Sequence, residues 1–327
     1  MMRRSITAAM AAVALLASPA AANDSVASMQ AGGLVLETTD GITMLSEDLY
    51  LSASEVRVTY RFLNHTDEGI DTIVAFPMPD IEPGYVGDTG GVLDEPERIL
   101  PFITWVDGYA VHTEVEKRAV VEGVDVTERL QALNVPLSPY GQDTLDALQA
   151  LPETVRDALA AEGVVSLGGD EGNRWAWPEW TLKTTHYWTQ YFPPGEEVEI
   201  RHIYAPAVGG TTVTMVGNPV LSGDPGAEYE ERYCTDDALV AAARRGWDSG
   251  LHYSETWLDY VLVTGANWSG PIRDFRLVVD KGSTDNLVSF CAEGVTRISP
   301  TQFEVRRTNY TPNRDLNVLI LNGARYD

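Results

Sequence analysis

The residues best suited to contacting a ligand gather in one short stretch of the chain. Three tryptophans lie within six positions of one another: Trp175, Trp177 and Trp180. Their flat apolar rings could stack on sugars or peptides, whereas aromatic rings at this density more often fill or cap a core. Pro178 interrupts the stretch and Gly172-Asn173-Arg174 precedes it, which is typical of a loop. We therefore take the three tryptophans as candidate binding residues, with core packing as the alternative.

Two clusters of mostly acidic residues contain side chains of the types that bind cations. His112, Glu114 and Glu116 alternate, so a strand would place them on one face about 7 Å apart. Neighbouring positions on one strand converge poorly on a single ion, and the alternation is typical of a solvated strand face. A glycine-rich loop also holds several acids, but their spacing is not that of a calcium-binding loop: Asp80, Glu82, Asp88, Asp94 and Glu95. We expect no metal ion and no cofactor.

The first residues have the pattern of a secretory signal peptide. Arg3 and Arg4 precede a short apolar run, Ile6–Leu16, and the small residues Ala20–Ala22 supply a cleavage site. A membrane anchor is the alternative, but a spanning helix needs about 20 apolar residues. No later segment is long and apolar enough to span. We expect residues 1–22 to be removed and the mature protein to be periplasmic or secreted.

The cysteine count agrees with an oxidising compartment. Cys234 and Cys291 are the only two cysteines, and an even count in an exported chain favours a disulfide. A lone distant pair has poor spacing for zinc, and a free catalytic thiol outside the cytoplasm would be prone to oxidation. We predict a Cys234–Cys291 disulfide.

Charge and motifs exclude several classes of function. The net charge of −25 becomes −27 when Arg3 and Arg4 leave with the signal peptide, and such a surface repels nucleic acid. The sequence contains no G-x-S-x-G, H-E-x-x-H, G-x-G-x-x-G or phosphate-loop motif. We expect a non-enzymatic binding or structural module for an unidentified envelope protein or glycan. The alternative is an envelope polysaccharide or peptide hydrolase with paired carboxylates, which leave no local motif.

Many short alternating segments separated by turn residues predict a mostly β protein. We expect two β-sandwich-like modules with a small helical insertion between them. The predicted boundaries are an N-terminal β module at 23–125, a helical insertion and loop at 126–170, and a C-terminal β module with the disulfide at 171–327. The insertion is predicted to hold two or three short helices, including Glu153–Glu162, which ends before Gly163.

Two segments are each predicted to form an antiparallel hairpin. The first joins Ser54–Phe62 to Ile70–Phe76 through a polar turn. The second joins Thr181–Phe192 to Val198–Tyr204 through Pro193-Pro194-Gly195-Glu196, and it loosely repeats the first. A tighter hairpin is predicted around Asp107-Gly108, a strong two-residue turn signal. Asp236–Arg245 is predicted to be a short helix.

Several long stretches carry a resemblance to a known family. They are NDSVASMQAGGLVLETTDGITMLSEDLYLS, VRVTYRFLNHTDEGIDTIVAFPMPDI, HYWTQYFPPGEEVEIRHIYAPAVGG and YVLVTGANWSGPIRDFRLVVDK followed by LVSFC. Together they resemble the bacterial exported domain-of-unknown-function family 4424 over nearly the whole mature chain. The resemblance implies no activity, substrate or catalytic residue. The segment ending in FPMP is also distantly similar to the vault and inter-α-trypsin β-domain. In that family an adhesion domain with a D-x-S-x-S metal-ion motif usually follows, and this sequence has no such motif.

The first testable prediction is the processing site. Because the small residues end at Ala22, we expect cleavage between Ala22 and Asn23. N-terminal sequencing of protein recovered from the periplasm or the medium should begin at Asn23. Recovery of intact Met1 from a cytoplasmic pool would contradict export.

Overall fold

The computed structural model describes residues 23–30, 33–83, 102–170, 174–221 and 226–325, and it is mostly β as predicted. The predicted signal peptide and most of the acidic loop lie outside these residues. In the described part of the chain, no helix is both long and apolar enough to cross a membrane.

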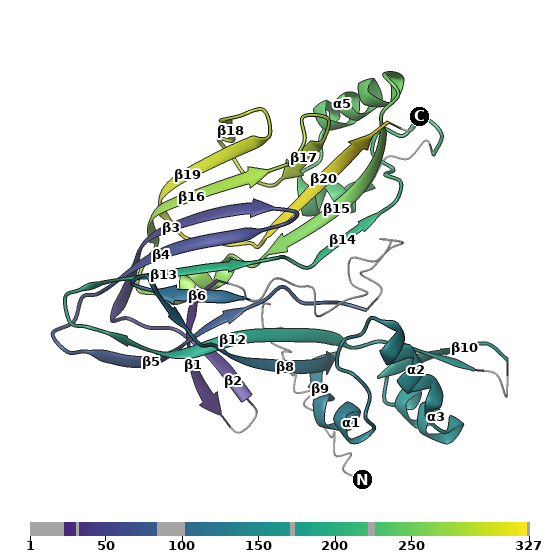
Figure 1. Ribbon diagram of the computed structural model, residues 1–327, viewed down its shortest axis with the longest axis horizontal. Helices are drawn as coiled ribbons and strands as arrows, with labels where there is room; N and C mark the ends of the chain where they lie inside the picture. Colours follow the sequence, from purple (N-terminus) through teal and green to yellow (C-terminus); the bar gives the residue numbers. More distant parts are fainter. Residues whose placement is uncertain (1–22, 31–32, 84–101, 171–173, 222–225, 326–327) are drawn as a thin grey trace, which may run out of the picture.

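The largest sheet has eight strands in the order β18-β19-β16-β3-β4-β13-β6-β7 (Figure 1). Its neighbours are antiparallel except for the parallel pair β3 and β16. Its strands are β3 (Ile42–Ser52), β4 (Val56–Asn64), β6 (Ile103–Val106), β7 (Tyr109–Val111), β13 (Glu197–Tyr204), β16 (Ile272–Asp280), β18 (Thr296–Arg297) and β19 (Gln302–Tyr310).

Two smaller sheets, of six and four strands, provide the remaining framework. The first has the order β2-β1-β5-β12-β8-β9 and the second β14-β15-β20-β17. The six strands are β1 (Ser25–Gln30), β2 (Gly33–Glu37), β5 (Ile70–Pro77), β8 (Glu114–Val121), β9 (Val124–Asp125) and β12 (Thr181–Phe192). The four are β14 (Val208–Thr211), β15 (His252–Tyr260), β17 (Leu287–Phe290) and β20 (Leu316–Ala324).

One hydrophobic core joins all three sheets. On β4 the residues Val56, Val58, Tyr60 and Phe62 are completely buried, as the period-2 alternation of this strand predicts. The same cluster contains Phe76 of the six-stranded sheet and residues of β15 and β20. The eight-stranded sheet therefore buries its inner face against both smaller sheets, in the manner of a sandwich.

The two long predicted hairpins are wrong in their pairing, although their strands exist. β4 pairs with β3 and β13, whereas β5 pairs with β1 and β12. Each predicted turn instead carries the chain from one sheet to the facing sheet, which makes a β-arch. Both strands of each arch carry bulky apolar faces, and facing sheets let these faces cover one another. The rings of Phe62 and Phe192, for example, meet at 6.0 Å between centroids.

The two arches are stacked side by side. β4 of the first arch pairs with β13 of the second, and β5 of the first pairs with β12 of the second. The two segments that resemble each other in sequence are therefore neighbours in the structure. The buried Asn64 links both turns, because its amide nitrogen donates to the carbonyl oxygens of Glu68 and Phe192. Its backbone carbonyl oxygen accepts from the Gly195 N–H.

The smaller predicted hairpin at Asp107-Gly108 is confirmed, with positive φ at both residues.

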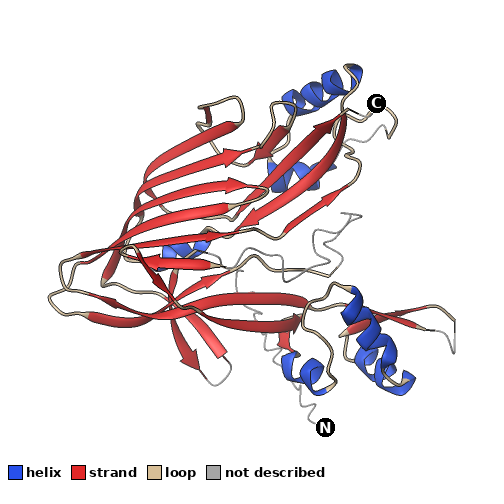
Figure 2. Cartoon of the chain, viewed as in Figure 1, coloured by secondary structure: helices blue, strands red, loops and turns tan. Residues whose placement is uncertain are grey.

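Residues 126–170 form three helices, at the upper end of the predicted number: α1 (Thr127–Ala132), α2 (Gln142–Ala150) and α3 (Glu153–Ala161). They pack with the small hairpin of β10 (Val165–Gly168) and β11 (Trp175–Pro178) around a core of their own. Figure 2 shows this group at one corner of the molecule. The predicted segments 23–125 and 171–327 flank the insertion, but strands from both segments form the eight-stranded and the six-stranded sheet. The strands of the two arches pair with each other, although the two arches lie in different segments of the chain.

The predicted disulfide is present at the other end of the molecule. Cys234 follows α4 (Gly226–Tyr233) and Cys291 follows β17, and their Cα atoms are 5.0 Å apart. The predicted helix after Cys234 is α5 (Asp237–Asp248), and the Asp236 carboxylate caps it by accepting from the Leu239 N–H. Both helices pack on the four-stranded sheet through a separate cluster that includes Tyr233 and Tyr253.

Removing the disulfide should destabilise the protein. The bond closes a loop with a sequence separation of 57, which corresponds to ~4 kcal/mol in the chain-entropy model. We expect the Cys234→Ser/Cys291→Ser variant to unfold at markedly lower urea concentration than the oxidised protein. Thiol labelling of the denatured, unreduced protein should find no free thiol. Two labelled cysteines would mean that the bond does not form in the cell.

Candidate functional site

The structure divides the three candidate tryptophans between a core and a surface. Trp180 is completely buried, and its indole N–H donates to the Leu137 carbonyl oxygen at 2.8 Å. Trp175 and Trp177 are 52% and 51% exposed. Packing therefore accounts for Trp180, while the other two remain available for contact.

The strand geometry of β11 explains the division. Its burial alternates, so that Trp175 and Trp177 point outward while Ala176 and Pro178 are buried, and Ala176 packs in the core of the helices. The partner strand β10 places Gly168 opposite Trp175. A methyl group on Gly168 would lie 3.8 Å from the Trp177 indole nitrogen, so the indole lies close over this glycine. The two exposed rings therefore share one face of a short, supported hairpin.

A groove of about 410 Å³ lies beside Trp177. Its walls are mostly aromatic and proline side chains: Pro83, Pro139, Tyr140, Gly141, Leu145, Trp177, Pro178 and Glu179. Proline and aromatic rings have little conformational freedom to lose, so such a wall is largely pre-formed for a ligand. Glu179 is the acidic group among these lining residues.

The surroundings of the groove are acidic. Between residues 126 and 170 the acids outnumber the bases: Glu128, Asp143, Asp146, Glu153, Asp157, Glu162 and Asp170, against Arg129 and Arg156. Arg129 bonds to Glu162, and Arg174 bonds to Asp157. Arg156 is buried, where it donates to the Gln149 carbonyl oxygen. The helical insertion therefore presents a negative potential to an approaching ligand.

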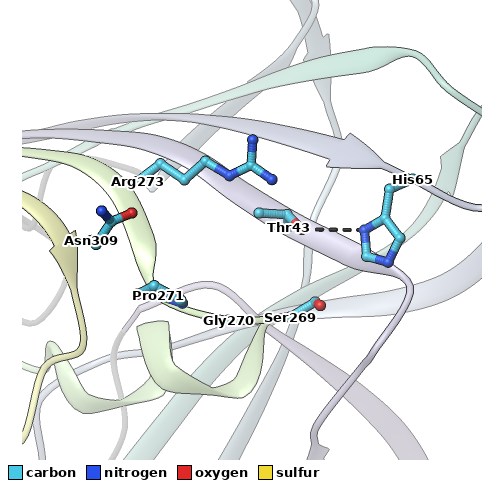
Figure 3. Close-up of a pocket in the computed structure, with 7 residues that line it drawn as sticks. All are labelled: Thr43, His65, Ser269, Gly270, Pro271, Arg273 and Asn309. Atoms are coloured by element: carbon cyan, nitrogen blue, oxygen red, sulfur yellow. Dashed lines mark hydrogen bonds between the residues drawn. The ribbon is translucent and has the colours of Figure 1, made fainter.

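A second pocket, of about 390 Å³, lies at the ends of strands β3, β4, β16 and β19 of the eight-stranded sheet and is polar (Figure 3). Thr43, His65, Ser269, Gly270, Pro271, Arg273 and Asn309 line it. The Thr43 hydroxyl and His65 Nδ1 are 3.2 Å apart, and the Arg273 side chain extends above them. Arg273 and His65 are groups that could hold an anion, but the pocket is open and has no carboxylate among its lining residues.

Two carboxylates that act on each other electrostatically, those of Asp24 and Glu47, are enclosed by the core. Asp24 is completely buried and Glu47 is 1% exposed. Asp24 Oδ1 lies 3.1 Å from His202 Nε2, and His202 Nδ1 lies 3.0 Å from the Thr104 hydroxyl. Neither acid lines either pocket, so a substrate in these pockets would not reach them.

Burial dominates the protonation of this pair. It raises the pKa of the Glu47 carboxyl to about 8, which a hydrogen bond from Asn23 opposes and the charge of Asp24 increases. Burial also raises the pKa of the Asp24 carboxyl, against the lowering effect of His202. Burial lowers the pKa of the nearby His186 imidazole to about 4, with His202 and Lys117 adding to the effect.

The acidic group on the strand is not assembled into a metal centre. His112 and Glu114 are highly exposed and 3.8 Å apart, while Glu116 accepts from the Leu34 N–H. Within the described ranges, no three His, Cys, Asp or Glu side chains are placed to hold a metal ion. Of the acids in the predicted loop, Asp80 and Glu82 are described, and Asp80 pairs with Lys183. Asp88, Asp94 and Glu95 lie outside the described residues.

Sequence reasoning missed Tyr140, Pro83 and Pro139 of the groove. Pro139-Tyr140-Gly141 carries a turn signal, but nothing in the local sequence places it beside Trp177, because α2 and α3 lie between them in the chain. The buried acids were also missed, since nothing in the local sequence distinguishes Asp24 or Glu47 from an exposed acid.

Comparisons with known proteins agree with the resemblance seen in the sequence. The family model described as Domain of unknown function (DUF4424) matches residues 22–319. No curated protein matches the chain in sequence. A solved structure of a candidate nutrient binding protein from Legionella pneumophila subsp. pneumophila str. Philadelphia 1 is 14% identical with a TM-score of 0.44, covering 92% of this chain and 70% of that one. An M1 zinc metallopeptidase from Deinococcus radiodurans is 11% identical with a TM-score of 0.26, and the match covers 86% of this chain and 43% of that one.

The burial difference between the tryptophans predicts opposite stability effects. Trp180→Ala should cost about 3–5 kcal/mol, because it leaves a cavity and removes the partner of the Leu137 carbonyl. Trp177→Ala should change the free energy of unfolding by about 0.5 kcal/mol or less, as exposed substitutions do. Urea unfolding of the two variants checks both values. Equal losses would place Trp177 in the core and remove it from the candidate site.

Proposed function

The chain belongs to the family Domain of unknown function (DUF4424), and we propose that it is an exported, non-enzymatic binding protein. In this proposal the groove beside Trp177 holds an extended segment of a partner protein. The observation that carries the proposal is the pair of half-exposed tryptophans on one face of β11, next to a groove walled by Tyr140 and prolines.

Exposed tryptophans of this kind are typical of binding hot spots. Trp and Tyr are the residues that most often dominate interface energies, because they bury a large area at low conformational cost. Grooves lined by aromatic rings also hold extended, proline-rich peptides, which occupy them without internal hydrogen bonds. The groove volume of about 410 Å³ lies within the range of small-ligand and peptide sites.

The charge of the insertion favours a basic partner. Seven acids and two arginines between residues 126 and 170 give this region a net charge of −5, and complementary charge speeds association and excludes acidic competitors. We therefore propose a partner segment that carries apolar or proline residues flanked by Lys or Arg. A glycan partner is the alternative, because indole faces also stack on sugars.

The hydrolase alternative has weaker support. It needs two carboxylates about 5–10 Å apart in a cleft that a polymer can enter. Asp24 and Glu47 are enclosed by the core, and each described pocket has at most one carboxylate among its lining residues. The Cys234–Cys291 disulfide supports the exported location, since such bonds persist in oxidising compartments.

A capture experiment tests the proposed function. Mature protein is immobilised and incubated with envelope extract, beside a Trp175→Ala/Trp177→Ala variant and a control, Tyr109→Ala. Tyr109 is 79% exposed and lies on β7, away from the groove. We expect the double variant to lose the captured protein at least about tenfold, because it loses its stacking surfaces, while Tyr109→Ala retains it.

The same experiment separates the two partner classes. Capture that survives protease digestion of the extract but not glycosidase digestion would indicate a glycan. If the double variant captures the same molecules in the same amounts as the wild type, the groove is not the binding site.

A further inference from the structure

The first residues of the predicted mature chain lie in the middle of the core. Asn23, Asp24 and Ser25 are all completely buried. Asn23 and Thr264 exchange two hydrogen bonds: the Asn23 N–H donates to the Thr264 hydroxyl at 2.7 Å, and that hydroxyl donates to the Asn23 carbonyl oxygen at 2.9 Å. The Trp268 indole N–H donates to the Asp24 carbonyl oxygen. A chain terminus is ordinarily exposed and loosely held, so this enclosure needs an explanation.

The packing around Asn23 leaves no spare room. A methyl group on Gly265 would lie 2.7 Å from the Asn23 amide nitrogen, closer than non-bonded atoms allow. That amide nitrogen donates to Glu47 Oε2 at 3.1 Å. Gly265 therefore permits the η2 turn (Val263–Asn267) to close over the first residue.

The buried polar atoms in this place are incompletely satisfied. Three acceptor oxygens have no hydrogen-bond partner among the described residues: Asn23 Oδ1, Asp24 Oδ2 and Glu47 Oε1. The buried Glu255 is different, because its two oxygens accept from Thr214, Tyr229 and Trp257. An unpaired buried carboxylate costs several kcal/mol, so the oxygens of Asp24 and Glu47 call for a donor, and a charged one in particular.

Among the described residues, the buried acids Asp24 and Glu47 have one positively charged partner too few. Asp24 has His202 as its partner. The Asn23 amide and the Tyr260 hydroxyl act on Glu47 as hydrogen-bond donors and the Asp24 carboxylate acts on it by its charge, so none of these groups is positively charged. The nearby Tyr60 and Tyr260 hydroxyls bond to each other at 2.9 Å and are neutral. Two carboxylates thus share one imidazole.

We propose that removal of the signal peptide creates the missing cation: the α-ammonium group of Asn23 becomes the buried counter-ion of Asp24 and Glu47. The signal peptidase hydrolyses the Ala22–Asn23 bond, so water supplies the hydroxyl to the Ala22 carboxyl and a proton to the Asn23 nitrogen, which takes a further proton from solvent. One N–H donor becomes three, and a unit of positive charge appears at an atom already inside the cluster. This inference rests on the cleavage position within the proposed function.

The consequence is a core that is completed by processing. In the precursor, the Asn23 nitrogen is a neutral amide with one donor, and Glu47 must stay protonated or remain unpaired. In the mature chain, the ammonium offers two further donors for the three unpartnered oxygens. Full stability would then follow export and cleavage, in the compartment where the disulfide also forms.

Chains with defined first residues test the proposal. A cleavable fusion yields one protein beginning at Asn23 and another with Ala22 retained, each in a wild-type and a Glu47→Gln background. Glu199→Gln, which neutralises an exposed acid on β13, is the matched control. All six proteins are compared by urea unfolding at neutral pH with the disulfide intact.

We expect retention of Ala22 to raise the unfolding equilibrium constant at least about 100-fold in the wild-type and Glu199→Gln backgrounds, as loss of one partner of a buried ion pair does. In the Glu47→Gln background the effect should fall below about 5-fold, because no second carboxylate needs the ammonium. If the extended wild-type chain does not fold at all, Glu47→Gln should restore its folding.

Chemical labelling provides a readout that does not depend on stability. The α-amine of the native chain beginning at Asn23 should react with an acylating reagent at least about 20-fold more slowly than in the urea-denatured chain, whereas the Ala22 amine of the extended chain should react at the same rate in both. A fast-reacting Asn23 amine, an extension without effect, or an extension that is equally damaging in the wild-type and Glu47→Gln backgrounds would each overturn the proposal. Because these chains bypass export and leave Trp177 intact, failure here is distinct from failure of the cleavage position or of the groove.

Discussion

The mutual burial of two stacked β-arches is the constraint on which the rest of the structure depends. Each arch sends one strand to the eight-stranded sheet and the other to the six-stranded sheet, so the aromatic rings of Phe62 and Phe192 meet between the layers. Phe76 packs from the opposite sheet against Tyr204 and His202. Protein interiors are close-packed, so the contacts between these rings set the distance between the two sheets. The elements attached to the sheet edges take their positions from that distance.

The candidate binding groove lies outside that constraint. The helical insertion has a core of its own around Leu130, Leu148 and Trp180. The groove forms where the turn at Pro139-Tyr140 of this insertion faces the end of β11 and Pro83. A rigid sandwich that carries a smaller, variable unit is a common way to present a binding surface, since the unit can change without disturbing the main core. The separation also explains why Trp180 and Trp177, three positions apart, have different roles.

The centre of the sandwich contains polar groups as well as rings. Asp24, His202 and Thr104 form a buried chain of hydrogen bonds that crosses from the start of β1 to the eight-stranded sheet. Buried polar networks stabilise a unique arrangement only when their members are satisfied. If the chain is cleaved before Asn23, as we propose, the enclosed position of Asn23 connects the processing of the chain with the completion of its core.

Much of the secondary structure followed from the sequence alone. The alternation of Val56, Val58, Tyr60 and Phe62 predicted a half-buried strand. Asp107-Gly108 predicted the turn of the β6–β7 hairpin, and two cysteines in a chain with a predicted export signal predicted their disulfide. These features depend on the chemistry of neighbouring residues or on a count. Which strands pair was decided only by the tertiary structure, because an alternating strand followed by a turn can fold back within one sheet or cross to a facing one. The exposure of Trp177, the burial of Trp180 and the enclosure of Asn23 depend on that same pairing, since each is set by residues distant in the chain.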